Sequence, residues 1–399
     1  MLVLMRSRGL VGKFFGPLVA AFFSVVLAAC GSQFGSRPAS PVLPQANLTS
    51  GEVLSTGTVR VALLLPRSST GNAGSVAQSF RDAAKLAADD FPNSGVELVV
   101  YDTAGTTEGA QTAANKSIAE GSEIILGPLF ANNVRAVSPI ARQAGIPVVA
   151  FSSDASVAAP GVYLLSFLPS DDIKRIVSYS GSQGRRAFAA LLPQNAYGQV
   201  VEAAFRQSVG SAGGRIVAIE RYDPAQGDIA TKAAAIATLG DQVDAVLIPD
   251  GGTQLATATQ SLAAAGMSAQ AVRYLGSGQW DDAQTISNPS LAGSWFPAPS
   301  KAGFDAFSRR FQSAYGSSPP RNATLAYDAT VLAAGLVRQF GGNRFTRDVL
   351  TNPNGFNGLD GVFRFNQDGT TERQLAVVEI TGSGVRVVSP ARQTVAGGS

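Results

Sequence analysis

The chain has 399 residues, of which 45% are hydrophobic and 15% charged, a composition typical of a chain that folds and buries more than one core. It contains no histidine and a single cysteine, Cys30. Mechanisms that need an imidazole base, a histidine metal ligand, an intrachain disulfide or a cysteine metal cluster are therefore excluded, and with them most hydrolases and zinc enzymes.

The first 30 residues have the layout of a secretory signal. Three basic residues precede an apolar run over residues 14–29, and residues 27–30 read Leu-Ala-Ala-Cys. This ending resembles the bacterial lipobox, in which the cysteine is lipidated and becomes the mature N-terminus. The alternative is a membrane anchor, but a run of 16 residues is short for a span of about 20. We predict a signal peptide over residues 1–29 and lipidation at Cys30, which would anchor the protein in a membrane.

The charge balance argues against nucleic acid as a partner. The formal net charge is +3, and residues 1–29 contain three basic residues and no acidic ones, so their removal leaves 28 of each sign. A neutral body without a basic patch has no electrostatic attraction for a phosphate backbone. No nucleic-acid partner is expected.

Residues 30–56 are rich in Ser, Gly and Pro and predict a flexible tether. After residue 57, short β-rich apolar runs alternate with alanine-rich stretches of helical period, a pattern that indicates βαβ units. Strands are expected over residues 59–65, 96–102, 124–126, 147–150, 187–192, 216–221, 245–248 and 273–275. Two late helices, 302–315 and 323–339, precede strands 361–365 and 375–380, which form a hairpin around a turn at 366–369. The number of alternations predicts an α/β protein with two lobes, each a mainly parallel sheet flanked by helices.

Several phrases, in their order along the chain, resemble the type I periplasmic-binding fold and its leucine/isoleucine/valine-binding branch over residues 58–378. They are VALLLP at 61–66, IILGPL at 124–129, AGIPVV at 144–149, QNAYG at 194–198 and GVFRFNQDG at 361–369. The resemblance implies three crossings between the lobes, near 167–169, 295–299 and 359–361. Lobe 1 would then comprise residues 57–167 and 297–359, lobe 2 residues 168–296 and 360–383, and residues 384–399 would form a C-terminal tail.

The resemblance also implies a ligand in the cleft between the lobes, which agrees with the general position of ligands at the carboxyl ends of parallel strands. From lobe 1 it assigns Asn132, after the Gly-Pro turn, and the hydroxyls of Ser152 and Ser153. Asn132 and Ser153 could equally cap helices. Arg67, after the first strand, could bind an anion or face water.

From lobe 2 the resemblance assigns Tyr197, which could equally pack within its lobe. Amino-acid-binding members carry an acid that pairs with the ligand ammonium at the position of Gly278. Asp250 or Asp281 could replace it from a neighbouring loop. A buried ammonium without a partner is costly, so Gly278 predicts no binding of leucine, isoleucine or valine.

Two functions follow, and the missing acid favours the first. Residues 127–134 and 149–154 look like those of lipoproteins called penicillin-binding protein activators, which implies a regulator of peptidoglycan synthesis whose partner is a peptidoglycan synthase. The alternative is a solute-binding lipoprotein that delivers an amino acid or similar small polar ligand to an ABC permease. A glycosidase using Asp250 and Asp281 has no precedent in the resemblance, so we expect no enzyme and no cofactor. Gly31, following the lipidated cysteine, favours the periplasmic face of the outer membrane.

We predict that Cys30→Ser abolishes lipidation and leaves the signal peptide attached, because the chain has no other cysteine. Mass spectrometry of the membrane fraction should show a diacylated or triacylated N-terminal cysteine in the wild type and an uncleaved precursor in the variant. An unmodified Cys30 in the mature wild-type protein would contradict the assignment.

Overall fold

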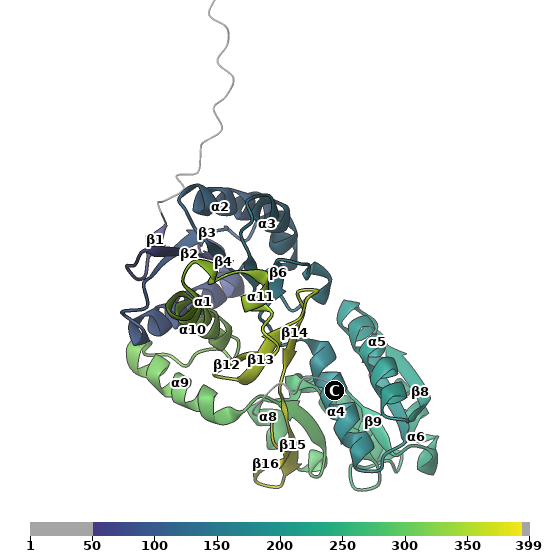
Figure 1. Ribbon diagram of the computed structural model, residues 1–399. Helices are drawn as coiled ribbons and strands as arrows, with labels where there is room; N and C mark the ends of the chain where they lie inside the picture. The colour runs from purple at the N-terminus through teal and green to yellow at the C-terminus, as the bar shows by residue number, and fades with distance from the viewer. Residues whose placement is uncertain (1–50, 393–399) are drawn as a thin grey trace, which may run out of the picture. The chain divides into compact units, whose positions relative to one another are not determined.

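The computed structural model describes residues 51–392, shown in Figure 1. The expected signal peptide, Cys30 and most of the expected tether lie outside the described residues. Within 51–392, no helix has both the length and the apolar character that crossing a membrane requires.

The C-terminal end of the expected tether belongs to the folded body. β1 (Glu52–Val53) pairs antiparallel with β3 (Val96–Asp102), and Leu54 is only 6% exposed in the core of the first lobe. The expectation of a tether reaching residue 56 is therefore wrong over its last residues. Backbone pairing and burial of Leu54 hold them against the sheet.

The first lobe is built on a six-stranded sheet of order β1-β3-β2-β4-β5-β6. All strands except β1 run parallel to their neighbours. The central strands are almost wholly apolar, as expected where helices cover both faces of a sheet. The remaining strands are β2 (Val59–Leu65), β4 (Ile124–Leu126), β5 (Val148–Ala150) and β6 (Val162–Leu164).

Helices cover both faces of this sheet (Figure 1). On one face, α1 (Gly71–Asp90) and α10 (Ala323–Phe340) pack against the side chains of Val61, Leu63 and Leu65. On the other, α2 (Thr107–Ala119) and α3 (Ala131–Gln143) pack against Ala62 and Leu64. The alternation of contacts along β2 follows from the two-residue period of a strand.

The second lobe contains a seven-stranded sheet of order β16-β15-β11-β10-β9-β7-β8. The strands from β8 to β11 are parallel, whereas β15 and β16 join the edge antiparallel. The strands are β7 (Ala187–Pro193), β8 (Arg215–Tyr222), β9 (Ala245–Leu247), β10 (Arg273–Leu275), β11 (Trp295–Ala298), β15 (Ala376–Thr381) and β16 (Gly384–Ser389). One face is covered by α4 (Pro169–Ser182) and α5 (Ala196–Ser211), the other by α6 (Ile229–Ala237) and α7 (Gly252–Ala264).

Smaller elements complete the described structure. A three-stranded antiparallel sheet packs against the core of the first lobe through Phe363 and Phe365. Its strands are β12 (Phe356–Gly358), β13 (Gly361–Phe365) and β14 (Thr371–Arg373). The remaining helices are α8 (Ala283–Ile286), α9 (Lys301–Tyr315) and α11 (Arg347–Leu350).

The chain passes between the lobes three times. The first passage lies between β6 and α4, and the second between β11 and α9, whose Phe307 and Phe311 belong to the core of the first lobe. The third lies between β14 and β15. The expected third crossing at 359–361 is therefore wrong, because the phenylalanines of β13 are buried in the first lobe and hold residues 361–373 there.

The structure also corrects the C-terminal region. The expected hairpin between residues 361–365 and 375–380 does not form, since β13 pairs with β14 whereas β15 pairs with β11 and β16. The expected tail at 384–399 begins with a strand, because β16 supplies the hydrogen-bond partners that β15 needs on its outer side. Gly384 has φ 144°, in the range that favours glycine, at the tight turn between these two strands.

We predict that Phe363→Ala lowers the free energy of unfolding by about 3–5 kcal/mol, because the ring is 1% exposed and its loss leaves a cavity. Val387→Ala, on the exposed side of β16 with 59% exposure, should change it by about 0.5 kcal/mol or less. Denaturant unfolding of both variants measures the difference. Equal effects would show that β13 is not part of the core.

Candidate functional site

In the first lobe, a polar hollow of about 650 Å³ lies beside the loops that follow β3, β4 and β5. Asn132 lines it and is exposed, and its Oδ1 accepts a hydrogen bond of 3.0 Å from Arg135. Arg135 also forms an ion pair of 2.9 Å with Asp154. The hollow therefore contains the Asn132 amide and the Arg135 guanidinium, whose present contacts are exposed to solvent and could be replaced by contacts to a ligand.

The two predicted serines differ in their surroundings. Ser152 is 4% exposed, and its Oγ accepts a hydrogen bond of 3.2 Å from the backbone N–H of Asp154. Ser153 is exposed. Neither Asn132 nor Ser153 caps a helix, because α3 has Phe130 at its N-cap and the short helix after β5 is capped by Asp154. The capping alternative for these two residues is therefore wrong.

Asn133 is a polar residue of this hollow that the sequence analysis did not select. It is 2% exposed, lines the hollow, and its Nδ2 has no hydrogen-bond partner within the described residues. Helical spacing could have identified it, because Asn133 lies four residues before the buried Val137 on the same face of α3. A buried amide donor without a partner is costly and favours an acceptor brought by a ligand.

In the second lobe, Tyr197 lies in the first turn of α5, where the Asn195 side chain caps the helix by accepting from the backbone N–H of Gly198 at 2.9 Å. The Tyr197 hydroxyl lies 3.2 Å from both the Pro249 carbonyl oxygen and the Ser277 Oγ. Burial raises the pKa of Tyr197 to about 12, so the hydroxyl stays protonated. Tyr197 thus connects the loops that follow β7, β9 and β10.

Asp250 follows β9 and accepts a hydrogen bond from the Tyr222 hydroxyl. Burial raises the pKa of its carboxyl to about 6. The buried Trp280 fixes this loop, since its Nε1–H donates to the carbonyl oxygens of Ile248 and Asp250, each at 3.0 Å. The Asp250 carboxylate is therefore held in place, although burial has removed part of its hydration.

Asp172 is a second residue of the candidate site that the sequence does not predict. It lies in the first turn of α4, and its Oδ2 accepts a hydrogen bond of 2.8 Å from the backbone N–H of Gly278. A Cβ atom at position 278 would lie only 2.9 Å from this oxygen. The carboxylate therefore occupies the space beside Gly278 that a side chain at that position would enter.

The electrostatic surroundings of Asp172 are unusual. Burial raises the pKa of Asp172 to about 7, and the neighbouring charge of Asp171 acts in the same direction. No cation within the described residues forms an ion pair or hydrogen bond with it. The hydrogen bond from the Gly278 N–H lowers the pKa of Asp172 but does not offset the solvation lost on burial. A cation brought by a ligand would offset this loss.

Other residues considered from the sequence are engaged elsewhere. Asp281 forms an ion pair of 3.2 Å with Lys301, and Arg67 donates to Gln78 at 2.7 Å and lies 3.7 Å from Glu52. Within the described residues, no cluster of three or more His, Cys, Asp or Glu has the arrangement of a metal site. The polar residues that converge in the second lobe are Asp172, Tyr197, Asp250 and Ser277.

A family model described as periplasmic binding protein matches residues 58–385, most of the chain. This chain belongs to the periplasmic binding protein family. The resemblance drawn from the sequence phrases is thereby confirmed, and so is the two-lobed α/β architecture. The family is one of binding proteins.

Curated relatives match over parts of this periplasmic binding protein. An uncharacterized protein of Rickettsia prowazekii is 27% identical over 143 residues, which is 36% of this chain and 38% of the relative. The penicillin-binding protein activator LpoA of Pantoea ananatis is 27% identical over 132 residues, 33% of this chain and 19% of the relative. The matched segments thus span well under half the length of either relative.

Solved structures match over most of the chain and show the fold. A putative branched-chain amino acid ABC transporter protein from Rhodospirillum rubrum superposes with a TM-score of 0.73 at 20% identity, covering 83% of this chain and all of the other. A solute-binding protein of an ABC transporter from R. palustris, in complex with benzoate, has a TM-score of 0.59 at 20% identity, covering 86% and 98%.

We predict that the stability of the ligand-free protein falls as the pH rises through 6 to 7. The pKa values of Asp172 and Asp250 are raised in the folded state, so their stabilising contribution is complete below about pH 4 and is lost as they ionise. Asp172→Asn should reduce this fall, whereas Asp305→Asn, at an exposed site on α9, should leave it unchanged. Thermal unfolding between pH 4.5 and 8 measures both. A pH profile identical in wild type and Asp172→Asn would contradict the buried state of Asp172.

Proposed function

We propose that this protein is the solute-binding lipoprotein of an ABC importer, and that it binds a small polar ligand carrying an ammonium group, such as an amino acid. The observation that carries the proposal is the carboxylate of Asp172 beside Gly278. From the sequence alone, the missing ligand-pairing acid at position 278 favours a regulator of peptidoglycan synthesis. That premise no longer holds, because α4 supplies an acid to the same place.

The ammonium group would bind in the second lobe. Two partly buried carboxylates, Asp172 and Asp250, have raised pKa values because burial has removed water, and no cation among residues 51–392 forms an ion pair with either of them. A ligand ammonium within hydrogen-bond distance would favour their ionised forms, and such charge-assisted hydrogen bonds are stronger than neutral ones. Tyr197 would cover the ligand with its ring, since its hydroxyl is already engaged with Pro249 and Ser277.

The opposite end of the ligand would bind in the first lobe. The hollow there contains Asn132, the unpartnered amide of Asn133 and the N-terminus of α3, which favours negative charge. The adjacent loop contributes Ser152 and Ser153. A ligand carboxylate would accept hydrogen bonds from these groups, so the two lobes would recognise opposite charges of one small molecule.

The fold neighbours support this class of function. Those named above are proteins of ABC transporters, one of them in complex with benzoate. By this proposal an ABC permease is the protein partner, and the lipid at Cys30 keeps the binding lobes close to a membrane while they face the periplasm. Anchoring in the outer membrane, expected from Gly31, stays a prediction, and the inner membrane suits an importer better.

A second candidate function rests on a different observation. The match to the activator LpoA, at 27% identity over 132 residues, keeps regulation of a peptidoglycan synthase as the alternative. It predicts contact with a penicillin-binding protein and no small ligand. The matched segment covers 19% of the activator, so the rest of that protein has no counterpart in the match.

A thermal-shift panel of the proteinogenic amino acids, with benzoate included, tests the proposal. A true ligand at a hundredfold excess over its Kd stabilises the folded state by about 2.7 kcal/mol. We expect at least one amino acid to raise the melting temperature by several degrees in the wild type and not in Asp172→Asn. Asp305→Asn is the matched control, since it removes the same charge from an exposed position on α9.

The affinity should also depend on pH. Binding an ammonium requires ionised carboxylates, so the Kd for the amino acid should decrease as the pH rises from 5.5 to 8. Isothermal titration calorimetry measures this trend. Two results together would overturn the receptor proposal in favour of the regulator. No compound of the thermal-shift panel would raise the melting temperature, and the protein would specifically capture a peptidoglycan synthase from envelope extract.

A further inference from the structure

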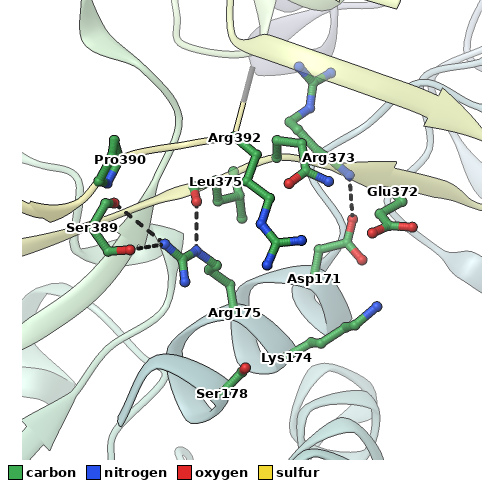
Figure 2. Close-up of a pocket in the computed structure, with 11 residues that line it drawn as sticks. Asp171, Lys174, Arg175, Ser178, Glu372, Arg373, Leu375, Ser389, Pro390 and Arg392 are labelled. Carbon is green, nitrogen blue, oxygen red and sulfur yellow. Dashed lines mark hydrogen bonds between the residues drawn. The ribbon is translucent and has the colours of Figure 1, made fainter. Parts of the chain in front are cut away.

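A second polar hollow, of about 260 Å³, lies where α4, the residues joining β14 to β15, and the segment after β16 meet (Figure 2). Neither Asp172 nor Asp250 lines it, so it is distinct from the candidate ligand site. Its charged lining residues are Asp171, Lys174, Arg175, Glu372, Arg373 and Arg392.

Three of the cations line this hollow, two from α4 and one from the segment after β16. Figure 2 shows Lys174 and Arg175 extending from α4 in different directions, with the guanidinium of Arg392 drawn between them. Arg175 is fixed, because it donates hydrogen bonds of 2.7 Å to the Leu375 carbonyl oxygen and to the Ser389 Oγ. Lys174 and Arg392 have no hydrogen-bond or ion-pair partner among residues 51–392.

The fourth cation does not face the hollow. The Arg373 side chain turns away from it (Figure 2), and its guanidinium lies over the Phe167 ring at 4.9 Å and the Phe363 ring at 5.2 Å. Only the Arg373 backbone takes part here, since its N–H donates to Asp171 Oδ2 at 3.3 Å. The Arg373 backbone therefore helps to hold Asp171 at the hollow, whereas the Arg373 guanidinium adds no positive charge to it.

The acids of the hollow do not neutralise these cations. Glu372 is paired with Arg364 at 2.7 Å. Asp171 also lines the hollow, and burial raises its pKa to about 7, so it is only partly ionised at neutral pH. Burial and the positive charge of Arg392 both lower the pKa of Arg175. The hollow thus concentrates positive charge that the described residues leave uncompensated.

We propose that this hollow binds a small oxyanion, of the sulfate, phosphate or carboxylate class, held by Lys174, Arg175 and Arg392. An oxyanion placed between the two guanidiniums would relieve their repulsion, and guanidinium groups match its oxygens geometrically. The volume of about 260 Å³ is sufficient for an ion of this size. Bound there, the anion would connect α4 to the third passage between the lobes and to the segment after β16.

The test is isothermal titration of the full-length protein with sodium sulfate, against sodium chloride at equal ionic strength. We expect saturable binding of sulfate, weakened about tenfold by Lys174→Ala and by Arg392→Ala, the effect of losing one charge-assisted hydrogen bond. Arg309→Ala is the control, because Arg309 is an exposed cation of α9 without a partner in the described part of the chain. Asp171→Asn should tighten binding, and Asp305→Asn should not.

Two results would overturn the proposal. The first is the absence of saturable heat with sulfate in the wild type. The second is equal weakening by Arg309→Ala and Lys174→Ala, which would show general charge attraction instead of a site. Amino-acid binding measured in the Lys174→Ala variant keeps this question separate from the proposed function, because Lys174 does not contact Asp172, Tyr197 or Asp250 by any hydrogen bond or ion pair.

Discussion

The burial of the parallel strands on both faces limits where polar side chains can lie in this protein. Because helices cover each sheet on two sides, polar side chains near the sheet are confined to the ends of the strands. The candidate site follows from this restriction: Asn132 comes after β4, Ser152 after β5, Tyr197 after β7 and Asp250 after β9. Loops that lie far apart in the sequence share an edge of a sheet, so few residues from each are enough to assemble a polar surface.

The first turn of α4 has two different roles because neighbouring residues of a helix point in different directions. Asp172 accepts from the backbone of Gly278 inside the second lobe, whereas Asp171 accepts from the backbone of Arg373, the last residue before the third passage. The helix begins at Pro169, directly after the first passage. One helical turn therefore connects the Asp172 carboxylate, which we propose binds the ligand, with two of the interlobe passages and the proposed anion site.

The candidate ligand residues of the second lobe and the hollow beside α4 have opposite charge. In the second lobe, Asp172 and Asp250 lose solvation without gaining a cation, so their pKa values rise. In the hollow beside α4, burial and the nearby positive charge of Arg392 lower the pKa of Arg175. Both situations cost free energy in the empty protein, and each would be relieved by a ligand of the opposite charge. In the second lobe and beside α4 alike, buried charge without a counter-charge is the physical reason to expect a ligand.

The sequence predicts the features that depend on local pattern, namely the alternation of strands and helices and the two α/β lobes, and its family resemblance at residues 194–198 predicts the turn after β7 that contains Tyr197. It misplaced the closing strands, because whether β15 pairs with β13 or with β11 depends on which core buries Phe363 and Phe365. It also missed Asp172, whose partner Gly278 lies 106 residues away. The acid lies beside that glycine through tertiary packing alone, because α4 packs against the second sheet and no spacing along the chain predicts this contact.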